Sequence, residues 1–564
     1  MRITRKMAST AVVGALVFTA TACAESQRGE GDPGDGGTDG GGGTSGQAGT
    51  IRFGAAGAPE MFDPLYATDG ETFRVTRQIF EGLLGIKPGG VEVVPELATE
   101  WTPNQEGTEW TFTLRDDVTF HDGTPFNAEA VCANFERMFD QNEAGQVAAE
   151  YWGYVMGGFS NDPKSSLYKS CDATGEFEAV VTINRATSGF PTMLTLSSLA
   201  MQSPTAMEEG NANDIKAEGE GFAFPEYADN PVGTGPFKFV EYDEANGSIT
   251  LEAYDDYYGE APKSSELIFR VIPDESTRRQ ELEAGSIDGY DFPSPTDWAG
   301  LEEEGNTVAI RDPFNIFYVG LNPAANPELM NDEVREALQY AIDREQLVQT
   351  QLPEGAEVAT QFMPSTVSGY NSGLEPYPYD PTKAKQLLQQ AGAEDLELTF
   401  AYPTDVSRPY MPDPQELYEA IRSNLEDVGI KVNVETASWN GGYLDNVTAG
   451  KYDAYLLGWT GDYDAAFNFI GTFFGNLKEN DFGTSEYPWG EQLAQDLMDA
   501  DAIVDEGERA AAFEEINRQI MEEYMPGVPI SHSPPALVVG PGVEGVIPSP
   551  LTAEEFDTVS VGGE

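Results

Sequence analysis

The sequence predicts a mixed α/β protein built from several domains. Its 564 residues are too many for one hydrophobic core, and this length corresponds to about three domains of ordinary size. Hydrophobic residues make up 40% of the chain, which is enough to form large cores. Short apolar runs typical of strands occur along the chain together with segments of helical periodicity. These observations predict interleaved strands and helices.

The net charge is the outlying feature of the composition. The chain has 96 acidic and 31 basic residues, which gives a formal net charge of -65. Such a surface repels nucleic acid and anionic lipid, and it favours neutral or cationic small partners. Adaptation of a secreted surface to salt, or a need for solubility, explains the same charge. We therefore predict no nucleic-acid partner, and the cause of the charge stays open.

Residues 1–22 are predicted to be a signal peptide. Three basic residues within the first six precede an apolar segment, residues 11–20, that is too short to span a membrane. Ala20-Thr21-Ala22-Cys23 resembles a bacterial lipobox, which implies that Cys23 is lipidated and becomes the mature N-terminus. Ordinary secretory cleavage at the same place is the alternative. Residues 23–50 are rich in Gly and Asp, so we predict a disordered tether.

The other two cysteines, Cys132 and Cys171, form an even pair in an oxidising compartment, and this predicts a disulfide between them. There is no CxxC motif, and the two histidines, His121 and His532, lie far apart, so a zinc site has few ligands to draw on. The chain contains no GxSxG elbow, P-loop or HExxH motif. We therefore predict no cofactor, no metal and no catalysis.

Several segments predict individual elements. Residues 51–54 form a short strand, and residues 72–84 carry helical spacing. Alternation within residues 110–120 predicts strands, and Asn127 is expected to begin a helix. The remaining clear patterns are an amphipathic helix at residues 333–342 and apolar strand runs at residues 396–402 and 455–457.

Five motifs resemble the signatures of one family and follow its order. They are V-P-E-L-A-T-E-W at 94–101, L-R-D-D-V-T-F-H-D-G-T-P-F at 114–126, V-G-T-G-P-F at 232–237, R-R-Q-E-L-E-A-G-S-I-D-G at 278–289 and E-V-R-E-A-L-Q-Y-A-I-D-R at 333–344. By this resemblance the chain is identified as a member of the bacterial extracellular solute-binding proteins of family 5, the peptide- and nickel-type receptors of ABC importers. The resemblance extends from about residue 51 to the end.

The resemblance implies two hinged α/β lobes of the periplasmic-binding-protein type, with an extra domain inserted in the first lobe. The ligand would lie in the cleft between the lobes, where closure removes it from water. The chain would cross between lobes near residues 300–311 and 525–530. The implied ranges are 51–95, 204–305 and 528–564 for lobe I, 96–203 for the inserted domain, which holds both cysteines, and 306–527 for lobe II.

Two stretches of lobe II resemble the family's dipeptide receptors. Residues 408–412 read R-P-Y-M-P, and residues 458–462 read G-W-T-G-D. The resemblance implies that Arg408 pairs with the α-carboxylate of a peptide and that Asp462 pairs with its α-ammonium. An ordinary surface ion pair of Arg408 and a solvated acidic turn at Asp462 are the alternatives. The family's proline after this aspartate is missing here, which leaves the path of the following loop open.

The chemistry requires these residue types. A peptide brings one positive and one negative end into a site that loses water, and an unpaired desolvated charge costs several kcal/mol. Arginine holds a carboxylate with two parallel hydrogen bonds, and aspartate accepts from an ammonium without a long flexible arm. Fixing both termini favours dipeptides over long peptides.

Weaker candidates surround these two residues. Met61, Phe62 and Tyr66 are expected to meet the ligand from the first lobe, and Asp464 is expected to face solvent. The further substrate-binding candidates of the second lobe are Trp459, Tyr410, Tyr318, Asn322, Trp439 and Tyr463.

We therefore predict a monomeric, lipid-anchored receptor on the outer face of the cell membrane that passes peptides, most of all dipeptides, to an ABC permease. An oligosaccharide receptor is the rival within the family, with Trp459 and Trp439 stacking on sugar rings. A nickel-complex receptor would lack histidines, and a secreted hydrolase would lack a catalytic triad.

Overall fold

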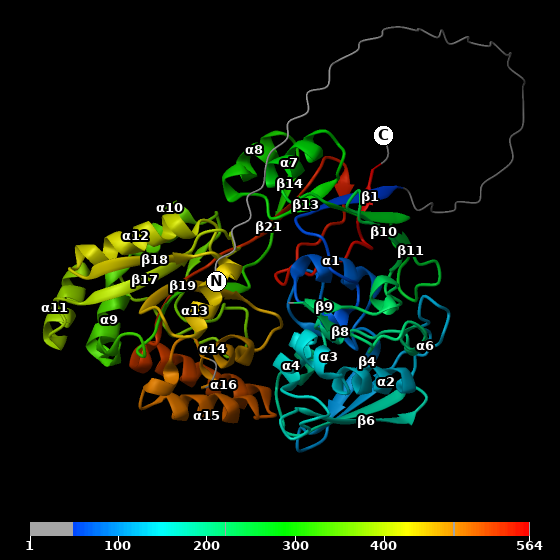
Figure 1. Cartoon of the computed structure of the whole chain (residues 1–564), viewed down its shortest axis with the longest axis horizontal. Helices are drawn as coiled ribbons and strands as arrows, with labels where there is room; N and C mark the ends of the chain where they lie inside the picture. Colours follow the sequence, from blue (N-terminus) through cyan, green and yellow to red (C-terminus); the bar gives the residue numbers. More distant parts are fainter. Residues whose placement is uncertain (1–48, 220, 478–479, 563–564) are drawn as a thin grey trace, which may run out of the picture. The chain divides into compact units, whose positions relative to one another are not determined.

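The computed structural model of the protein describes residues 49–219, 221–477 and 480–562 (Figure 1). The predicted signal peptide, the predicted lipidation site Cys23 and nearly all of the predicted tether lie outside these residues. Three larger sheets, of seven, six and four strands, form the framework of the described part. None of the helices described is both long enough and apolar enough to cross a membrane.

The first lobe is built on the seven-stranded sheet, in the order β10-β11-β12-β1-β13-β21-β14. Strand β1 (Thr50–Ala55) lies inside this sheet, parallel to β12 (Glu266–Val271) and β13 (Gly289–Asp291), and its Ile51 and Phe53 are buried. The other pairs are antiparallel. The remaining elements are β10 (Phe237–Asp243), β11 (Ser248–Ala253), β14 (Thr307–Ile310), β21 (Ala536–Val539), α1 (Gly70–Ile79), α7 (Glu275–Glu283) and α8 (Trp298–Glu303).

The second lobe is built on the six-stranded sheet, in the order β16-β20-β15-β19-β17-β18. Strand β15 (Asn315–Leu321) is buried at every residue because it lies between β20 (Gly527–His532) and β19 (Ala454–Thr460). Its other strands are β16 (Glu357–Val358), β17 (Glu397–Pro403) and β18 (Lys431–Ala437). Its helices are α9 (Asp332–Ala341), α10 (Arg344–Gln351), α11 (Pro381–Ala391), α12 (Pro414–Asp427), α13 (Leu444–Thr448), α14 (Thr472–Phe474), α15 (Gly490–Asp501) and α16 (Glu506–Gln519).

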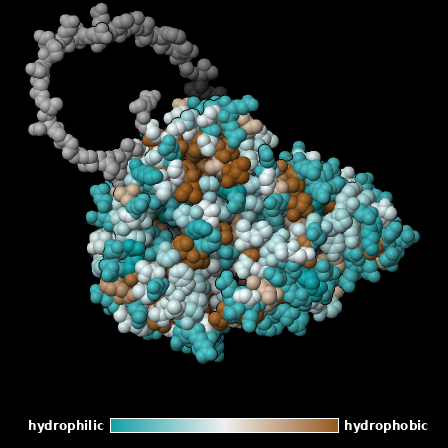
Figure 2. Space-filling view, turned by 180° about the vertical axis from the view of Figure 1, so that it is seen from behind, coloured by the Kyte–Doolittle hydropathy of each residue, from teal (hydrophilic) through white to brown (hydrophobic). Residues whose placement is uncertain are grey.

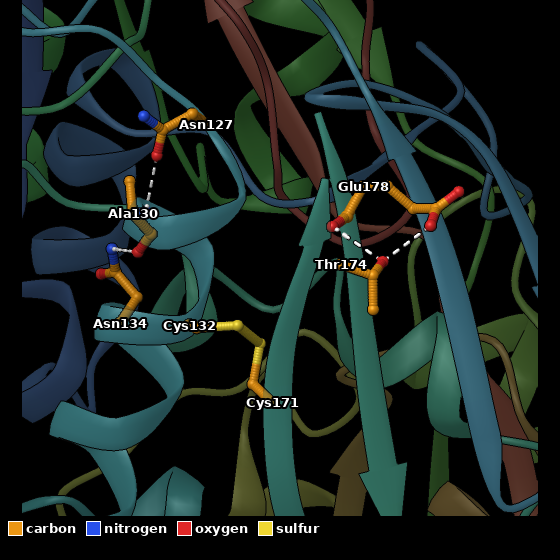
Figure 3. The surroundings of a disulfide bond; sticks show 7 residues. All are labelled: Asn127, Ala130, Cys132, Asn134, Cys171, Thr174 and Glu178. Atoms are coloured by element: carbon orange, nitrogen blue, oxygen red, sulfur yellow. Dashed lines mark hydrogen bonds between the residues drawn. A yellow bond between two sulfur atoms is a disulfide. The ribbon is translucent and has the colours of Figure 1, made fainter. Parts of the chain in front are cut away.

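A four-stranded antiparallel sheet, β4-β5-β7-β6, lies within the range expected for the inserted domain. Cys132 of α2 and Cys171 of β6 are joined by a disulfide, which confirms the predicted pairing (Figure 3). The bond ties the helix to an edge strand of this sheet. The elements here are β4 (Ala98–Pro103), β5 (Glu109–Leu114), α2 (Ala128–Phe139), α3 (Glu143–Ala148), α4 (Glu150–Met156), β6 (Tyr168–Gly175), β7 (Glu178–Ile183) and α5 (Phe190–Met193).

Short pieces complete the chain. The short strands pair as β2 (Leu84–Ile86) with β3 (Val93–Pro95), β8 (Lys216–Glu218) with β9 (Gly221–Ala223), and β22 (Val543–Glu544) with β23 (Ser560–Val561); α6 spans Pro204–Glu209. Hydrophilic residues cover most of the face shown in Figure 2, as the charge of the sequence requires.

Within the described residues the chain crosses between the two large sheets twice, a few residues later than expected. Residues 307–310 still belong to the first sheet, so the first crossing lies between β14 and β15. The second lies between β20, which pairs with β15, and β21. Fully buried Arg311 anchors the first crossing, because it pairs with Asp291 at 2.7 Å and with Glu554 at 2.6 Å in the first lobe. Residues 307–310 thus pair in the first sheet and residues 527–532 in the second, while the range 306–527 for lobe II stays a prediction.

Helix α1 shows why the periodic pattern at residues 72–84 gave the wrong ends. The helix begins earlier because Asp69 caps it, with Oδ1 accepting from the backbone N–H groups of Glu71 and Thr72 at 3.0 Å. It ends at Ile79 because Phe80 is extended, at φ -122° and ψ 149°. The apolar residues beyond Phe80 continue the pattern, but the chain there turns into β2.

Candidate functional site

A cleft of about 1410 Å³ lies between the two lobes, and it is also bordered by the range predicted to be an inserted domain, residues 96–203, which we continue to call the inserted domain. The first lobe contributes residues 68–71 together with Phe73, Arg74 and Arg77 of α1, and the inserted domain contributes Tyr151 and Tyr154 of α4. The second lobe contributes the end of β19 and the loop between β17 and α12. Pockets for small molecules usually measure about 300–1,000 Å³, so this cleft has room for a small ligand together with water.

Strand β19 delivers Asp462 to this cleft. The backbone N–H of Gly461 donates to Phe314 O at 2.9 Å, which holds the chain against the first residues of the second lobe. A Cβ at Gly461 would lie 2.3 Å from the Phe314 ring and 2.6 Å from the Phe469 ring. Only glycine fits there, and the tight approach brings Asp462 to the edge of the sheet.

Asp462 is held entirely by neutral donors. Its Oδ1 accepts from the Tyr151 hydroxyl of the inserted domain at 3.2 Å, and its Oδ2 accepts from Asn468 Nδ2 at 3.2 Å. Asn468 Oδ1 in turn accepts from the Asp462 backbone N–H at 2.8 Å. Within the described ranges no lysine or arginine forms an ion pair with Asp462. The carboxylate therefore has donors that orient it and no cation that neutralises it.

Burial raises the pKa of Asp462 to about 6, against an ordinary value of 3.8. The hydrogen bonds from Asn468 and Tyr151, and the more distant charge of Arg77, oppose this shift without cancelling it. A cation placed beside Asp462 would favour its charged form and lower the pKa again.

Arg408 lies in the loop between β17 and α12, where its backbone N–H and carbonyl both pair with Met411, at 3.1 and 2.9 Å. Its guanidinium carbon lies 4.6 Å from the centre of the Trp439 ring, a cation–π contact. Its Nε is buried without a hydrogen-bond partner. Unlike the buried Arg311, Arg408 forms no ion pair with any acid in the part of the chain described here, although acids outnumber bases threefold.

Tyr410 packs directly on the strand that carries Asp462. A Cβ at Gly458 would lie 2.4 Å from the Tyr410 ring and 2.4 Å from the Ile316 carbonyl, so glycine is required for this contact. Tyr410 is almost fully buried, which raises its pKa to about 12. The ring thus fixes the loop of Arg408 against β19.

Comparison with known proteins decides the family. The model of the bacterial extracellular solute-binding proteins, family 5 (middle region), matches residues 92–481, more than half of the chain. The chain belongs to this family.

This family 5 protein is 29% identical over 524 residues to the dipeptide-binding protein of Escherichia coli (strain K12), covering 91% of this chain and 95% of that protein. It is 29% identical over 525 residues to heme-binding protein A of Haemophilus influenzae, covering 91% and 93%. The periplasmic binding protein DppA of Helicobacter pylori, associated with an ABC transporter and solved in complex with peptide STSA, matches with a TM-score of 0.71 at 26% identity, over 91% of this chain and 98% of that one. The resemblance and the two-lobe α/β fold are confirmed.

The remaining candidates of this family 5 protein fall into two groups. Trp459, Tyr318 and Trp439 line the cleft, with the ring centre of Tyr318 5.4 Å from that of Phe473. Tyr463 also borders the cleft, but it is buried against Gly189 of the inserted domain. Asn322 lies outside the cleft, where its Nδ2 donates to the Asp481 carbonyl at 3.1 Å. This hydrogen bond gives Asn322 a structural role, and its contact with a ligand stays an untested prediction.

The first-lobe candidates were wrong. Met61 and Phe62 are core residues, and the Tyr66 hydroxyl donates to Gln141, a residue in the range of the inserted domain, at 2.8 Å. The first-lobe wall of the cleft comes instead from α1, including Phe73 and Arg77. The helical spacing at residues 72–84 was the signal that could have pointed there.

Asp464 was expected to face solvent, and this was wrong too. Its side chain is partly buried, and Oδ1 is enclosed without a hydrogen-bond partner. Burial raises its pKa to about 6. Asp464 does not border the cleft, so we assign it no contact with a ligand.

Proposed function

We propose that the protein is the extracytoplasmic, substrate-binding lipoprotein of an ABC importer and that it captures short peptides, chiefly dipeptides, in the cleft between its lobes. In this account Arg408 pairs with the peptide carboxylate and Asp462 with the peptide ammonium. The protein binds and releases its ligand as a monomer without chemistry, and Cys23 carries the lipid that keeps it at the membrane.

The observation that carries the proposal is a pair of opposite, unneutralised charges in one cleft. Arg408 and Asp462 both border it, and neither has an ion-pair partner among the described residues. Two isolated charges in a partly desolvated site destabilise the empty protein. A zwitterionic ligand supplies both missing partners, and a sugar supplies neither.

Similarity supports the ligand class. One relative is named as a dipeptide-binding protein, and one solved structure contains peptide STSA. Another relative is named as a heme-binding protein, so hemin belongs in the test. The aromatic rings of Trp459 and Trp439 would suit a sugar, which makes oligosaccharides the second control.

Calorimetric titration tests the proposal. The mature chain carrying Cys23→Ala would be titrated with dipeptides, tetrapeptides, cello-oligosaccharides and hemin. The proposal predicts dipeptide binding that exceeds the binding of the other ligands. Tight binding of a sugar or hemin, with no binding of any dipeptide, would overturn it. Mass analysis of the N-terminus of the membrane-extracted protein tests the lipid on Cys23.

A further inference from the structure

Three aromatic rings lie around Asp462 at the edge of the cleft. We define the aromatic cluster as Tyr151 and Tyr154 of the inserted domain and Trp459 of the second lobe, which all border the cleft. The Tyr151 hydroxyl donates to Asp462 Oδ1 at 3.2 Å, and the ring centres of Tyr154 and Trp459 lie 6.4 Å apart with their planes inclined by 37°. Trp459 Nε1 lies 3.5 Å from Oδ1 of Asn468, the residue that holds Asp462. A chain of direct contacts therefore joins all three rings to one carboxylate.

The rings of the aromatic cluster are accessible to a ligand. Tyr154 is 48% exposed, and Tyr151 and Trp459 are partly exposed. Most large aromatic side chains of the described residues are buried in the cores, so an open tyrosine at the border of the cleft is unusual for this chain. A ligand bound at Asp462 can therefore reach these rings without displacing core residues.

Each of these rings already uses its polar hydrogen within the protein. Tyr151 donates to the carboxylate, and the Trp459 indole N–H donates to Asn468 Oδ1. The Thr472 hydroxyl donates to the Asn468 carbonyl at 2.9 Å, so the Tyr154 hydroxyl, 2.5 Å from Thr472 Oγ1, is the donor in that second pair. The aromatic cluster therefore offers a ligand its ring faces, which attract cations, rather than free hydrogen-bond donors.

Asp462 accepts hydrogen bonds at both oxygens, and this limits what a ligand ammonium finds there. A carboxylate has about four lone-pair sites, and Tyr151 and Asn468 occupy about two of them. A primary ammonium brings three N–H donors into the site, and a desolvated donor without a partner is costly. An ammonium whose hydrogens are replaced by methyl groups has no such requirement, and aromatic faces are its usual partners in proteins.

We propose that Asp462 and the aromatic cluster form a subsite for methylated ammonium groups, quaternary ones included, at the N-terminus of the bound peptide. The proposal rests on the proposed function, because it assigns the ligand cation to Asp462. The carboxylate would neutralise the charge, and the methyl groups would lie against the rings of Tyr154 and Trp459. The protein would then bind peptides with N-methylated termini as well as unmodified ones.

Three related ligands test the subsite by titration calorimetry at fixed ionic strength, with the mature chain carrying Cys23→Ala. They are alanyl-alanine, N,N,N-trimethyl-alanyl-alanine and 2,3,3-trimethylbutanoyl-alanine, in which carbon replaces the quaternary nitrogen. We expect the trimethyl ligand to bind at most about threefold more weakly than alanyl-alanine. Its neutral isostere has the same shape without the charge, and it should bind at least about tenfold more weakly than the trimethyl ligand.

Variants of Tyr154 separate the ring face from the hydroxyl. Tyr154→Leu removes the face and should lower the ratio of the affinities for the trimethyl ligand and its neutral isostere about threefold to tenfold. Tyr154→Phe keeps the face and should leave this ratio unchanged. Tyr379→Leu is the matched control, because Tyr379 is 39% exposed and lies outside the cleft, and it should change neither affinity.

The outcomes are distinct. Failure of alanyl-alanine and every other dipeptide to bind would overturn the proposed function and the subsite with it. Binding of alanyl-alanine with a larger loss than about threefold on trimethylation would overturn the subsite alone, and so would a loss of less than about tenfold when carbon replaces the nitrogen. These comparisons use a chain with an intact cleft, so they hold even where a Tyr154 variant fails to fold. An unchanged ratio in folded Tyr154→Leu, or an equal fall in Tyr154→Phe, would also overturn the subsite.

Discussion

The amide of Asn468 holds Asp462 by two groups at once. Its Oδ1 accepts from the Asp462 backbone N–H at 2.8 Å, and its Nδ2 donates to Asp462 Oδ2 at 3.2 Å. Asn468 is itself buried, so this pairing fixes the carboxylate without adding charge. The cleft therefore contains an oriented anion that has no ion-pair partner among the described residues.

Asn468→Ala removes both hydrogen bonds and leaves the buried backbone N–H of Asp462 without a partner. Because an unmade buried hydrogen bond costs about 1–3 kcal/mol, we expect the free energy of unfolding to fall by that amount. Loss of orientation of Asp462 should also weaken dipeptide binding. Denaturant titration and calorimetry measure the two effects. Asn433→Ala, which removes an exposed hydrogen bond to Glu397, is the control and should change neither quantity. Unchanged affinity in Asn468→Ala would contradict the positioning role.

The pKa of Asp462 predicts how the empty protein responds to pH. The pKa of Asp462 is about 6 in the folded protein, whereas the pKa of an aspartate in the unfolded chain is about 3.9. The folded state therefore binds more protons between these values, and the contribution of Asp462 to stability falls as pH rises from about 4 to about 6. At pH 7 the ligand-free Asp462→Asn variant should be more stable than the wild type, by about 1–3 kcal/mol. Thermal melts at pH 4 and pH 7 measure this difference, and equal stabilities at pH 7 would contradict the shifted pKa.

The Asp501 carboxylate links the second lobe to the inserted domain. It lies at the C-terminus of α15, where a negative charge is unfavourable, and it accepts from the Ser188 hydroxyl at 2.8 Å. Arg185 lies 3.5 Å away. Asp501→Asn should weaken this contact, increase the population of open molecules without ligand and lower the affinity for dipeptides about threefold to tenfold. Small-angle X-ray scattering should show a larger radius of gyration than for the control Asp499→Asn, an exposed acid on α15 that accepts from Gln495. Equal radii and equal affinities would contradict the prediction.

The disulfide should stabilise the inserted domain without affecting the ligand site. Cys132 and Cys171 enclose a segment with a sequence separation of 39 residues, and closing a loop of that size contributes about 2–4 kcal/mol. Cys132→Ser with Cys171→Ser should therefore lower the melting temperature but leave dipeptide affinity nearly unchanged. Reduction of the wild type with dithiothreitol should reproduce the shift, and the double variant should not respond to it. A large loss of affinity would show that the bond also shapes the cleft.

The sequence predicted the parts of the site that are encoded locally. The R-P-Y and W-T-G-D motifs identified Arg408 and Asp462 as candidate binding residues, and both residues border the cleft. Asn468 was missed because its role depends on a π-helical turn at Phe467–Gly471 that returns the amide to Asp462. Tyr151 was missed because it meets Asp462 from the inserted domain, 311 residues away.

The ends of elements were the least predictable part of the fold. The apolar pattern of α1 continues past Ile79, yet Phe80 is extended, and the chain then packs so closely that a Cβ at Gly82 would lie 2.8 Å from the carbonyl oxygen of Leu194. The crossings between the sheets also lie later than expected. Strand β14 belongs to the first sheet because it pairs with β21, and β20 belongs to the second sheet because it pairs with β15. Such contacts between distant segments leave no periodic signal in the sequence.

The most direct test of the central claim combines changes in the protein with changes in the ligand. Wild type, Arg408→Ala and Asp462→Asn would each be titrated with alanyl-alanine, its C-terminal amide and its N-acetyl derivative. We predict that amidation weakens binding to the wild type at least about tenfold, which is 1.4 kcal/mol, and costs nothing further in Arg408→Ala. N-acetylation should likewise weaken binding to the wild type at least about tenfold and cost nothing further in Asp462→Asn. Full penalties for both blocked ligands in both variants would contradict the assignment of Arg408 and Asp462 to the two ends of a peptide.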